Sequence, residues 1–208
     1  MTISHTKLRE DLLAQPDAAL ILEELAQTLE AEKAKRREYY ALVHEDAKAE
    51  FINGEIIYQS PVKRKHWLVS INLSSLLHTY VKKHQLGEIG VEKVMISLTR
   101  NDYEPDICFF RKEKAAAFKK DQMHFPAPDF VVEILSDSTE KNDREIKFQD
   151  YAAHGVQEYW IIDPGKQTVE QYINEKQAFE LRQKFVTSGI LQSVVIEGFE
   201  AEISDLFA

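Results

Sequence analysis

Two apolar segments that read as buried strands each carry one carboxylate. Asp106 opens residues 107–110, and Glu133 lies in the middle of residues 130–135; each strand is preceded by a Pro-Asp pair. An ionised carboxylate among apolar side chains is costly unless a cation or several donors meet it. If the two strands are neighbours, Asp106 and Glu133 can point at one divalent ion. Such ions take carboxylate, water and phosphate oxygens as ligands, so the pattern indicates metal-dependent phosphodiester chemistry.

A lysine on the following helix is the third element of this pattern. Asp143, Lys147 and Tyr151 are four residues apart, so they form one stripe along a helix predicted over residues 140–153. The side chain of Lys147 can extend toward Glu133 and stabilise negative charge that develops on the phosphorane oxygens.

Each of these residues also has a structural interpretation. An acid and a base four residues apart on a helix are usually a solvated pair worth a few tenths of a kcal/mol. Glu133 and Lys147 can form a simple buried ion pair, and Asp106 can cap a turn. The paired Pro-Asp strands and the stripe together favour the functional interpretation.

Three further residues are candidates for a supporting role. His66 follows the basic run 63–65 at the start of a helix, where it can contact phosphate or water or be merely structural. Glu50 and Glu55 flank the turn at residues 53–54, where either can add a ligand or remain a solvated hairpin acid.

The elements that must position these residues follow from apolar periodicity and turn residues. Residues 8–42 read as a short helix and a longer one that begins near Pro16-Asp17. Asn53-Gly54 predicts a tight type I′ hairpin, because this pair tolerates the positive φ that the turn needs. The other predicted elements are a helix over residues 66–83, strands at 90–98, 105–110, 158–162 and 193–196, and a hairpin of 169–172 with 179–185. This order predicts a mixed sheet with helices on its faces.

The composition limits the class of protein. The chain has 208 residues, of which 44% are hydrophobic, so it can build one substantial core. Its net charge of −9 argues against passive coating of nucleic acid, which needs a broad basic surface. The single cysteine, Cys108, excludes an intrachain disulfide. Without a signal-peptide pattern or an apolar run of about 18 residues, we expect a cytoplasmic protein that does not cross a membrane.

Several of these segments together resemble a known family. The segment PDFVVEILSDST at residues 128–139, the stripe from Asp143 to Tyr151, and GVQEYWIIDP at residues 155–164 are similar to the signature of the Uma-type putative restriction endonucleases. EFINGE at residues 50–55, Ser60-Pro61 and Pro105-Asp106 fit the same pattern. The resemblance covers the chain from about residue 40 to its end, and the helical arm before about residue 38 lies outside it.

That family is similar to the PD-(D/E)XK nuclease superfamily, whose core is a helix, three strands, a helix and a strand. The resemblance implies Asp106 and Glu133 as ligands of Mg²⁺, with Mn²⁺ as an alternative. The superfamily places its lysine two residues after the acid, where this chain has Leu135, so Lys147 is the implied substitute.

The superfamily also has an acid on its first core helix, and residues 66–83 contain none. Glu50, Glu55 or His66 are the residues that can compensate.

We therefore expect a restriction-endonuclease-like α/β (α+β) fold, with a mixed sheet flanked by helices. Residues 1–38 are predicted to form an N-terminal helical arm and residues 39–208 the nuclease domain. The expected function is Mg²⁺-dependent hydrolysis of phosphodiester bonds in DNA, with a homodimer as a possible assembly. The alternatives are an inactive nuclease-fold module that binds nucleic acid or a protein partner, and a hydrolase of another phosphate ester.

Overall fold

The computed structural model describes residues 5–43 and 48–208. The helices are α1 (His5–Leu13), α2 (Ala18–Leu42), α3 (Arg64–His84), α4 (Lys112–Ala115), α5 (Glu140–Arg144), α6 (Ile146–Ala153) and α7 (Ile203–Phe207). The strands are β1 (Ala49–Ile52), β2 (Glu55–Tyr58), β3 (Gly87–Val91), β4 (Met95–Ser97), β5 (Asp102–Tyr103), β6 (Ile107–Arg111), β7 (His124–Phe125), β8 (Phe130–Ile134), β9 (Glu158–Asp163), β10 (Thr168–Glu175), β11 (Ala178–Val186), β12 (Ile190–Gln192) and β13 (Glu200–Glu202).

The central sheet has six strands in the order β11-β10-β9-β8-β6-β3. Neighbouring strands are antiparallel except β8 and β9, which are parallel and are joined through α5 and α6. A parallel pair needs such a crossover because a tight turn cannot join its ends. From α3 onward the sheet and its helices therefore follow the expected order of helix, three strands, helix and strand.

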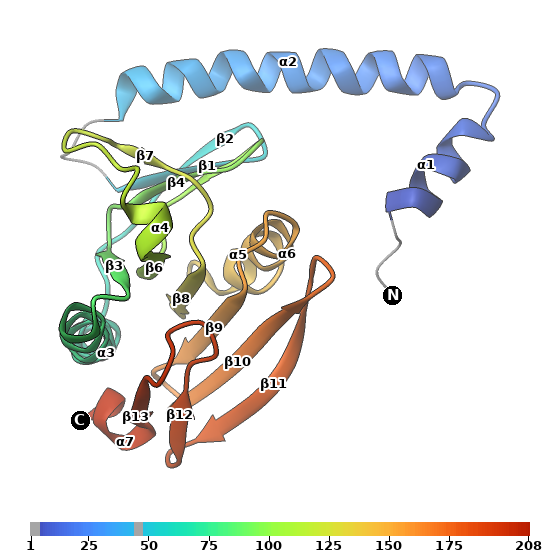
Figure 1. Cartoon of the computed structure of the whole chain (residues 1–208). Coiled ribbons are helices and arrows are strands. Elements are labelled where there is room, and N and C mark those ends of the chain that lie inside the picture. Colours follow the sequence, from blue (N-terminus) through green and yellow to red (C-terminus); the bar gives the residue numbers. More distant parts are fainter. Residues whose placement is uncertain (1–4, 44–47) are drawn as a thin grey trace.

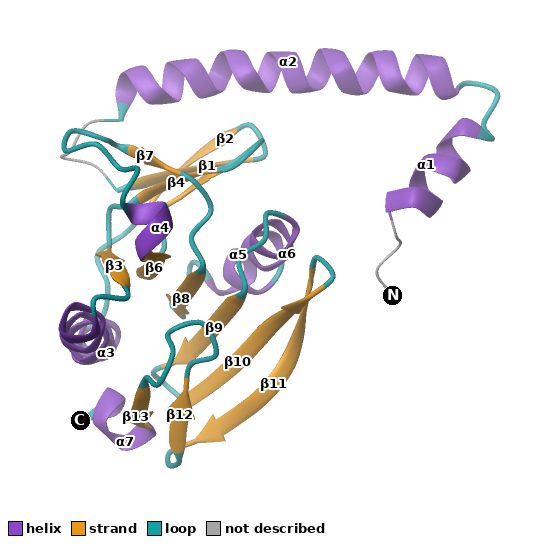
Figure 2. Cartoon of the chain, viewed as in Figure 1, coloured by secondary structure: helices purple, strands orange, loops and turns teal. Residues whose placement is uncertain are grey.

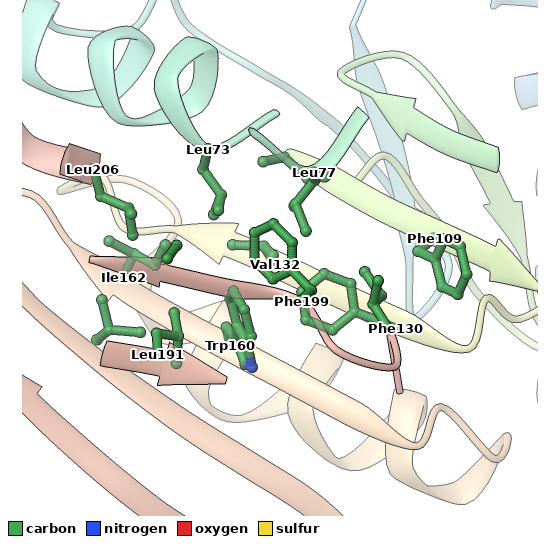
Figure 3. Close-up of a cluster of buried hydrophobic side chains, with 14 of the residues drawn as sticks. Leu73, Leu77, Phe109, Phe130, Val132, Trp160, Ile162, Leu191, Phe199 and Leu206 are labelled. Atoms are coloured by element: carbon green, nitrogen blue, oxygen red, sulfur yellow. The ribbon is translucent and has the colours of Figure 1, made fainter. Parts of the chain in front are cut away.

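Alternation along β8 gives its two faces different neighbours. Phe130, Val132 and Ile134 belong to a core beneath α3 that also contains Trp160 and Leu73 (Figure 3). The opposite face packs against α6, so α3 and α6 lie on opposite sides of β8 (Figure 2). Because side chains alternate along a strand, Glu133 points with its neighbours at 131 and 135 toward α6.

A second sheet, in the order β2-β1-β5-β4-β7, lies beneath the C-terminal half of α2 (Figure 1). The hairpin of β1 and β2 turns through Asn53 and Gly54 with φ of 52° and 84°, as the sequence predicts. The fully buried Tyr39 donates a 2.6 Å hydrogen bond to the carbonyl of Ala49.

The N-terminal residues form a short and a long helix, as predicted. The first half of α2, together with α1, extends past the sheets (Figure 1). The proposed boundary at residue 38 lies inside α2, so the helix is continuous across it.

Two predicted elements are interrupted in the structure, and a third is absent. The predicted strand at residues 90–98 is two strands, β3 and β4, separated by a turn in which Glu92 has a φ of 59°. The predicted helix at 140–153 breaks at Glu145, and the carbonyl of Asp143, which a continuous helix would use internally, accepts a hydrogen bond from the Tyr159 hydroxyl.

Residues 193–196 form a loop rather than the predicted strand. The amides of Val194 and Val195 and the hydroxyl of Ser193 all donate to the buried carboxylate of Glu158. A side chain thus satisfies the backbone groups that a neighbouring strand would otherwise have met.

Among the described helices, none combines the length and the apolar character that crossing a bilayer requires.

Candidate active site

The two acid-bearing strands are neighbours in the central sheet, which meets the condition on which the metal hypothesis depends. β6 pairs with β8 in a register that places Ile107 opposite Val132. Asp106 stands directly before β6, and its Oδ2 accepts a 2.7 Å hydrogen bond from the amide of Ile134. Asp106 and Glu133 consequently reach the same end of the strand pair.

Lys147 stands at the centre of a buried group of three carboxylates. Its Nζ lies 2.8 Å from Oε1 of Glu50, 3.0 Å from Oδ1 of Asp143 and 3.2 Å from Oε1 of Glu133. The side chain of Lys147 is only 2% exposed, so the pair of Asp143 and Lys147 is not the solvated surface pair of the structural alternative. Glu50 from β1 belongs to the group, so it is not the solvated hairpin acid of the alternative interpretation.

The electrostatics of this group follow from one ammonium facing several acids. Burial lowers the pKa of Lys147, but the surrounding carboxylates outweigh it and raise that pKa well above its usual value. Burial, together with the nearby Asp143, Asp106 and Glu50, raises the pKa of Glu133 well above its ordinary range. Negative charge is therefore in excess around Glu133, and an added cation would relieve it.

His66 and Lys48 surround the other acid. His66 Nε2 lies 3.3 Å from Oδ2 of Asp106, and Lys48 Nζ lies 3.7 Å from Oδ1 of the same carboxylate. Burial raises the pKa of Asp106, yet His66, together with the charge of Lys48 and the amide of Ile134, outweighs it, so the pKa is lowered and Asp106 stays ionised. Sequence reasoning missed Lys48, which carries no motif of its own.

Glu104 is a second residue that sequence reasoning missed. Its side chain is 4% exposed, and its Oε2 is buried without a hydrogen-bond partner. Burial, reinforced by Glu50, raises the pKa of Glu104 to about 7. The available signal was its position two residues before Asp106, a spacing that places both acids on one side of an extended segment.

A small cavity of about 20 Å³ joins these groups. Glu104, Asp106, Glu133 and Lys147 line it, with more exposed residues of the loops after β2 and β8 around its mouth. A volume of this size holds about one water molecule or one metal ion.

Other predicted site residues lie elsewhere. Glu55 is exposed on the hairpin and does not line the cavity. Tyr151 is fully buried in the apolar cluster beneath α6, and its hydroxyl lacks a hydrogen-bond partner. By contrast, Ser136 and Ser138 line the cavity and hydrogen-bond to each other at 3.1 Å, and Ser136 also to Thr139 at 2.9 Å, and neither side chain caps α5.

The donor set fits a hard divalent cation. Two carboxylates from adjacent strands, an excess of buried negative charge and the unpaired oxygen of Glu104 meet at one small cavity. Across residues 5–43 and 48–208, no three acidic, histidine or cysteine groups converge tightly enough to enclose an ion alone. Mg²⁺ usually binds one or two carboxylates and completes its shell with water and phosphate, so Asp106 and Glu133 are the residues that could hold such an ion.

A core of helix, three strands, helix and strand, with acids on its second and third strands, defines a protein with the restriction-endonuclease-like fold. Residues 36–204 match the Uma2 family, described as "Putative restriction endonuclease", and the chain belongs to that family. A crystal structure of "a putative nuclease belonging to DUF820" from Anabaena variabilis ATCC 29413 shares the fold, with a TM-score of 0.71 and 23% identity. The similarity covers 82% of this chain and 96% of that one.

Two proteins of Synechocystis sp. strain PCC 6803 are similar in sequence. "Uncharacterized protein sll1609" is 31% identical over 128 residues, which are 60% of this chain and 71% of the relative. "Uncharacterized protein slr1290" is 30% identical over 131 residues, which are 60% of this chain and 65% of the relative.

Proposed function

We propose that the protein is a Mg²⁺-dependent endonuclease that hydrolyses phosphodiester bonds in DNA. The main support is the meeting of Asp106 and Glu133, from adjacent strands, at a small acidic cavity that also contains Lys147. Membership of the Uma2 family supports the same reaction class.

In this proposal, Asp106 and Glu133 hold the metal ion. The chemistry that Mg²⁺ would supply there is polarisation of the scissile phosphate and a lowered pKa of an attacking water. Lys147 keeps Glu133 in place and lies near enough to the cavity to stabilise negative charge on the phosphate oxygens. The unpaired oxygen of Glu104 accepts a hydrogen bond from the attacking water, and His66 orients Asp106.

The acidity of the chain bears on how DNA is bound. A net charge of −9 weakens an isolated encounter with a polyanion. We therefore expect a second copy of the chain, or another partner, to contribute affinity.

Cleavage of supercoiled plasmid tests the proposal. The protein, the Glu133→Gln variant and the Glu55→Gln variant are each incubated with Mg²⁺ or Mn²⁺, and with EDTA as the metal-free control. We expect metal-dependent nicking by the protein and by Glu55→Gln, because Glu55 is exposed and outside the cavity. Nicking should be lost in Glu133→Gln, and unchanged cleavage by that variant would refute the assignment.

A non-catalytic binding module is the second candidate. It is favoured by one observation, that Lys147 already has three carboxylate partners and can serve as a purely structural centre. Calorimetric titration with Mn²⁺ separates the two candidates. Binding that Glu133→Gln removes supports the nuclease, whereas no binding to either protein supports the module.

A further inference from the structure

The first turn of α3 carries residues of opposite character on its inner and outer sides. His66 is 5% exposed and lines the cavity, and its Nδ1 is buried without a hydrogen-bond partner. Arg64, Lys65 and Trp67 are exposed on the same turn. We call these three residues the α3 platform.

Trp67 is the unusual member of the platform. It is 47% exposed, whereas Trp160, the only other tryptophan in the sequence, is fully buried in the core. The guanidinium of Arg64 lies 6.0 Å from the centre of the indole ring. A flat aromatic ring beside a guanidinium plane is the combination on which unpaired bases stack in proteins that bind single strands.

The charge of the platform is opposite to that of the whole chain. Lys63, Arg64 and Lys65 are consecutive and all exposed, in a chain with a net charge of −9. Lys63 forms a 2.6 Å ion pair with Asp137 in the loop after β8, and Lys65 also lowers the pKa of Asp137 after the stronger effect of Lys63. The basic run therefore lies against the loop that borders the cavity.

The α3 N-terminus adds a further attraction for phosphate. The backbone amides of the first turn of this 21-residue helix carry the positive end of its dipole. A strand that crosses this turn would place a phosphate beside His66 and an adjacent base beside Trp67. Stacking on the indole needs a base with a free face, which a paired duplex does not offer.

We infer that the α3 platform binds single-stranded DNA and guides the strand to the cavity, so that the substrate of the proposed nuclease is an unpaired strand. The part of this inference that concerns cleavage of the strand rests on the proposed function. Binding of the strand can be measured without cleavage.

Fluorescence anisotropy in EDTA tests the inference. The probes are labelled oligothymidine of about 16 nucleotides and a labelled blunt duplex of equal length. We expect tighter binding of the single strand. Trp67→Leu, which keeps apolar bulk without a flat ring, should weaken single-strand binding about 5- to 150-fold, the range for a lost stacking partner, and leave duplex binding unchanged.

Two controls are available on the same helix. Ile71→Ala removes another exposed apolar side chain one turn further along and should not change binding. Lys82 and Lys83 lie at the opposite end of α3, about 27 Å from Arg64 at 1.5 Å per residue. Their joint replacement by alanine should weaken single-strand binding less than Arg64→Ala with Lys65→Ala.

Tryptophan fluorescence gives an independent readout. Oligothymidine should quench the emission of Trp67, and Trp67→Phe should abolish the quenching while still binding in the anisotropy assay. Preference for the duplex, or full single-strand binding by Trp67→Leu, would overturn the inference. A shift in oligomeric state on Trp67→Leu without any change in DNA binding would also overturn it, in favour of a protein contact.

The outcomes separate this inference from the proposed function. Glu133-dependent plasmid cleavage without a preference for single strands would keep the nuclease and reject the platform. Single-strand binding with Trp67 quenching, but without cleavage, would keep the platform and reject the nuclease. Equal binding of oligouridine and oligothymidine would still support a single-strand platform, with RNA as an additional ligand.

Discussion

Lys147 balances three buried carboxylates, of which Glu50 and Glu133 come from two strands and Asp143 comes from the preceding helix. Removing one member of a buried ion pair leaves its partners uncompensated, which is more costly than losing a surface contact. The side chain therefore combines a structural role with the catalytic role that we propose for it.

Replacement of Lys147 by methionine should consequently be severe. We expect Lys147→Met to lower the free energy of unfolding by about 3–5 kcal/mol at pH 8. The loss should shrink at low pH, because protonation neutralises the surrounding acids. Urea unfolding at both pH values measures it, and Lys166→Met serves as control, since its ammonium is exposed beside Asp163. Equal losses in the two variants would contradict this account.

Ionisation of the buried Glu104 lowers the stability of the folded protein. Its pKa is raised to about 7, so the folded protein binds its proton more tightly than the unfolded chain does. The penalty for ionising it is absent below the unfolded pKa of about 4.5 and is complete above about pH 7.

Glu104→Gln should accordingly stabilise the protein at pH 8 in EDTA, by on the order of 1–3 kcal/mol. The same substitution should change the free energy of unfolding much less near pH 4. Chemical unfolding at the two pH values gives the comparison. A stabilisation that is independent of pH would show that ionisation of Glu104 is not its cause.

At the scale of elements, Arg36 is one of the residues that hold α2 on the second sheet. Nε and Nη2 of Arg36 lie 2.6 and 2.7 Å from the two carboxylate oxygens of Asp102, and Nη2 also reaches the carbonyl of Leu98 at 2.9 Å. The side chain of Asp102 is fully buried beneath the helix. This bidentate ion pair holds the C-terminal half of α2 against the sheet.

Arg36→Met should therefore release this helix end. We expect a loss of about 2–4 kcal/mol in the free energy of unfolding, because Asp102 keeps its burial and loses its charged partner. Limited proteolysis should cut within α2 faster than in the unaltered protein. The matched control is Arg37→Met, whose side chain is exposed on the next position, and similar proteolysis of both variants would reject this role.

At the scale of the whole molecule, the acids around the cavity and the net negative charge both add electrostatic repulsion to the folded state. The chain carries a net charge of −9, and several of its acids surround one small cavity. A cation that binds there relieves repulsion only in the folded state, so it should stabilise the fold by mass action.

Mg²⁺ or Mn²⁺ should thus raise the melting temperature. At about 100 times its Kd, a cation contributes about 2.7 kcal/mol to the free energy of unfolding. Differential scanning fluorimetry should show an increase for the protein and for Glu55→Gln, but none for Glu133→Gln. An equal increase in all three would indicate general screening of charge instead of a site.

The sequence by itself determined the parts of the protein that depend on local patterns. The apolar run around Glu133, the Asn53-Gly54 turn and the amphipathic helix after His66 each follow from side-chain periodicity or turn chemistry within a few residues. The order of the core elements could be predicted on this basis, whereas the pairing of the two acid-bearing strands was only a condition of the hypothesis and is established by the register of β6 with β8.

Only the tertiary structure decided which distant residues join the site. Lys48 carries no motif, and the position of Glu104 two residues before Asp106 does not reveal that its carboxylate is buried beside the cavity. The break in the predicted helix after Asp143 and the loop around Glu158 are equally long-range, since each depends on a hydrogen bond to a remote segment. Local sequence patterns determine where the helices and strands form. The site depends on buried charged groups that meet partners distant in the sequence, which only the tertiary structure brings together.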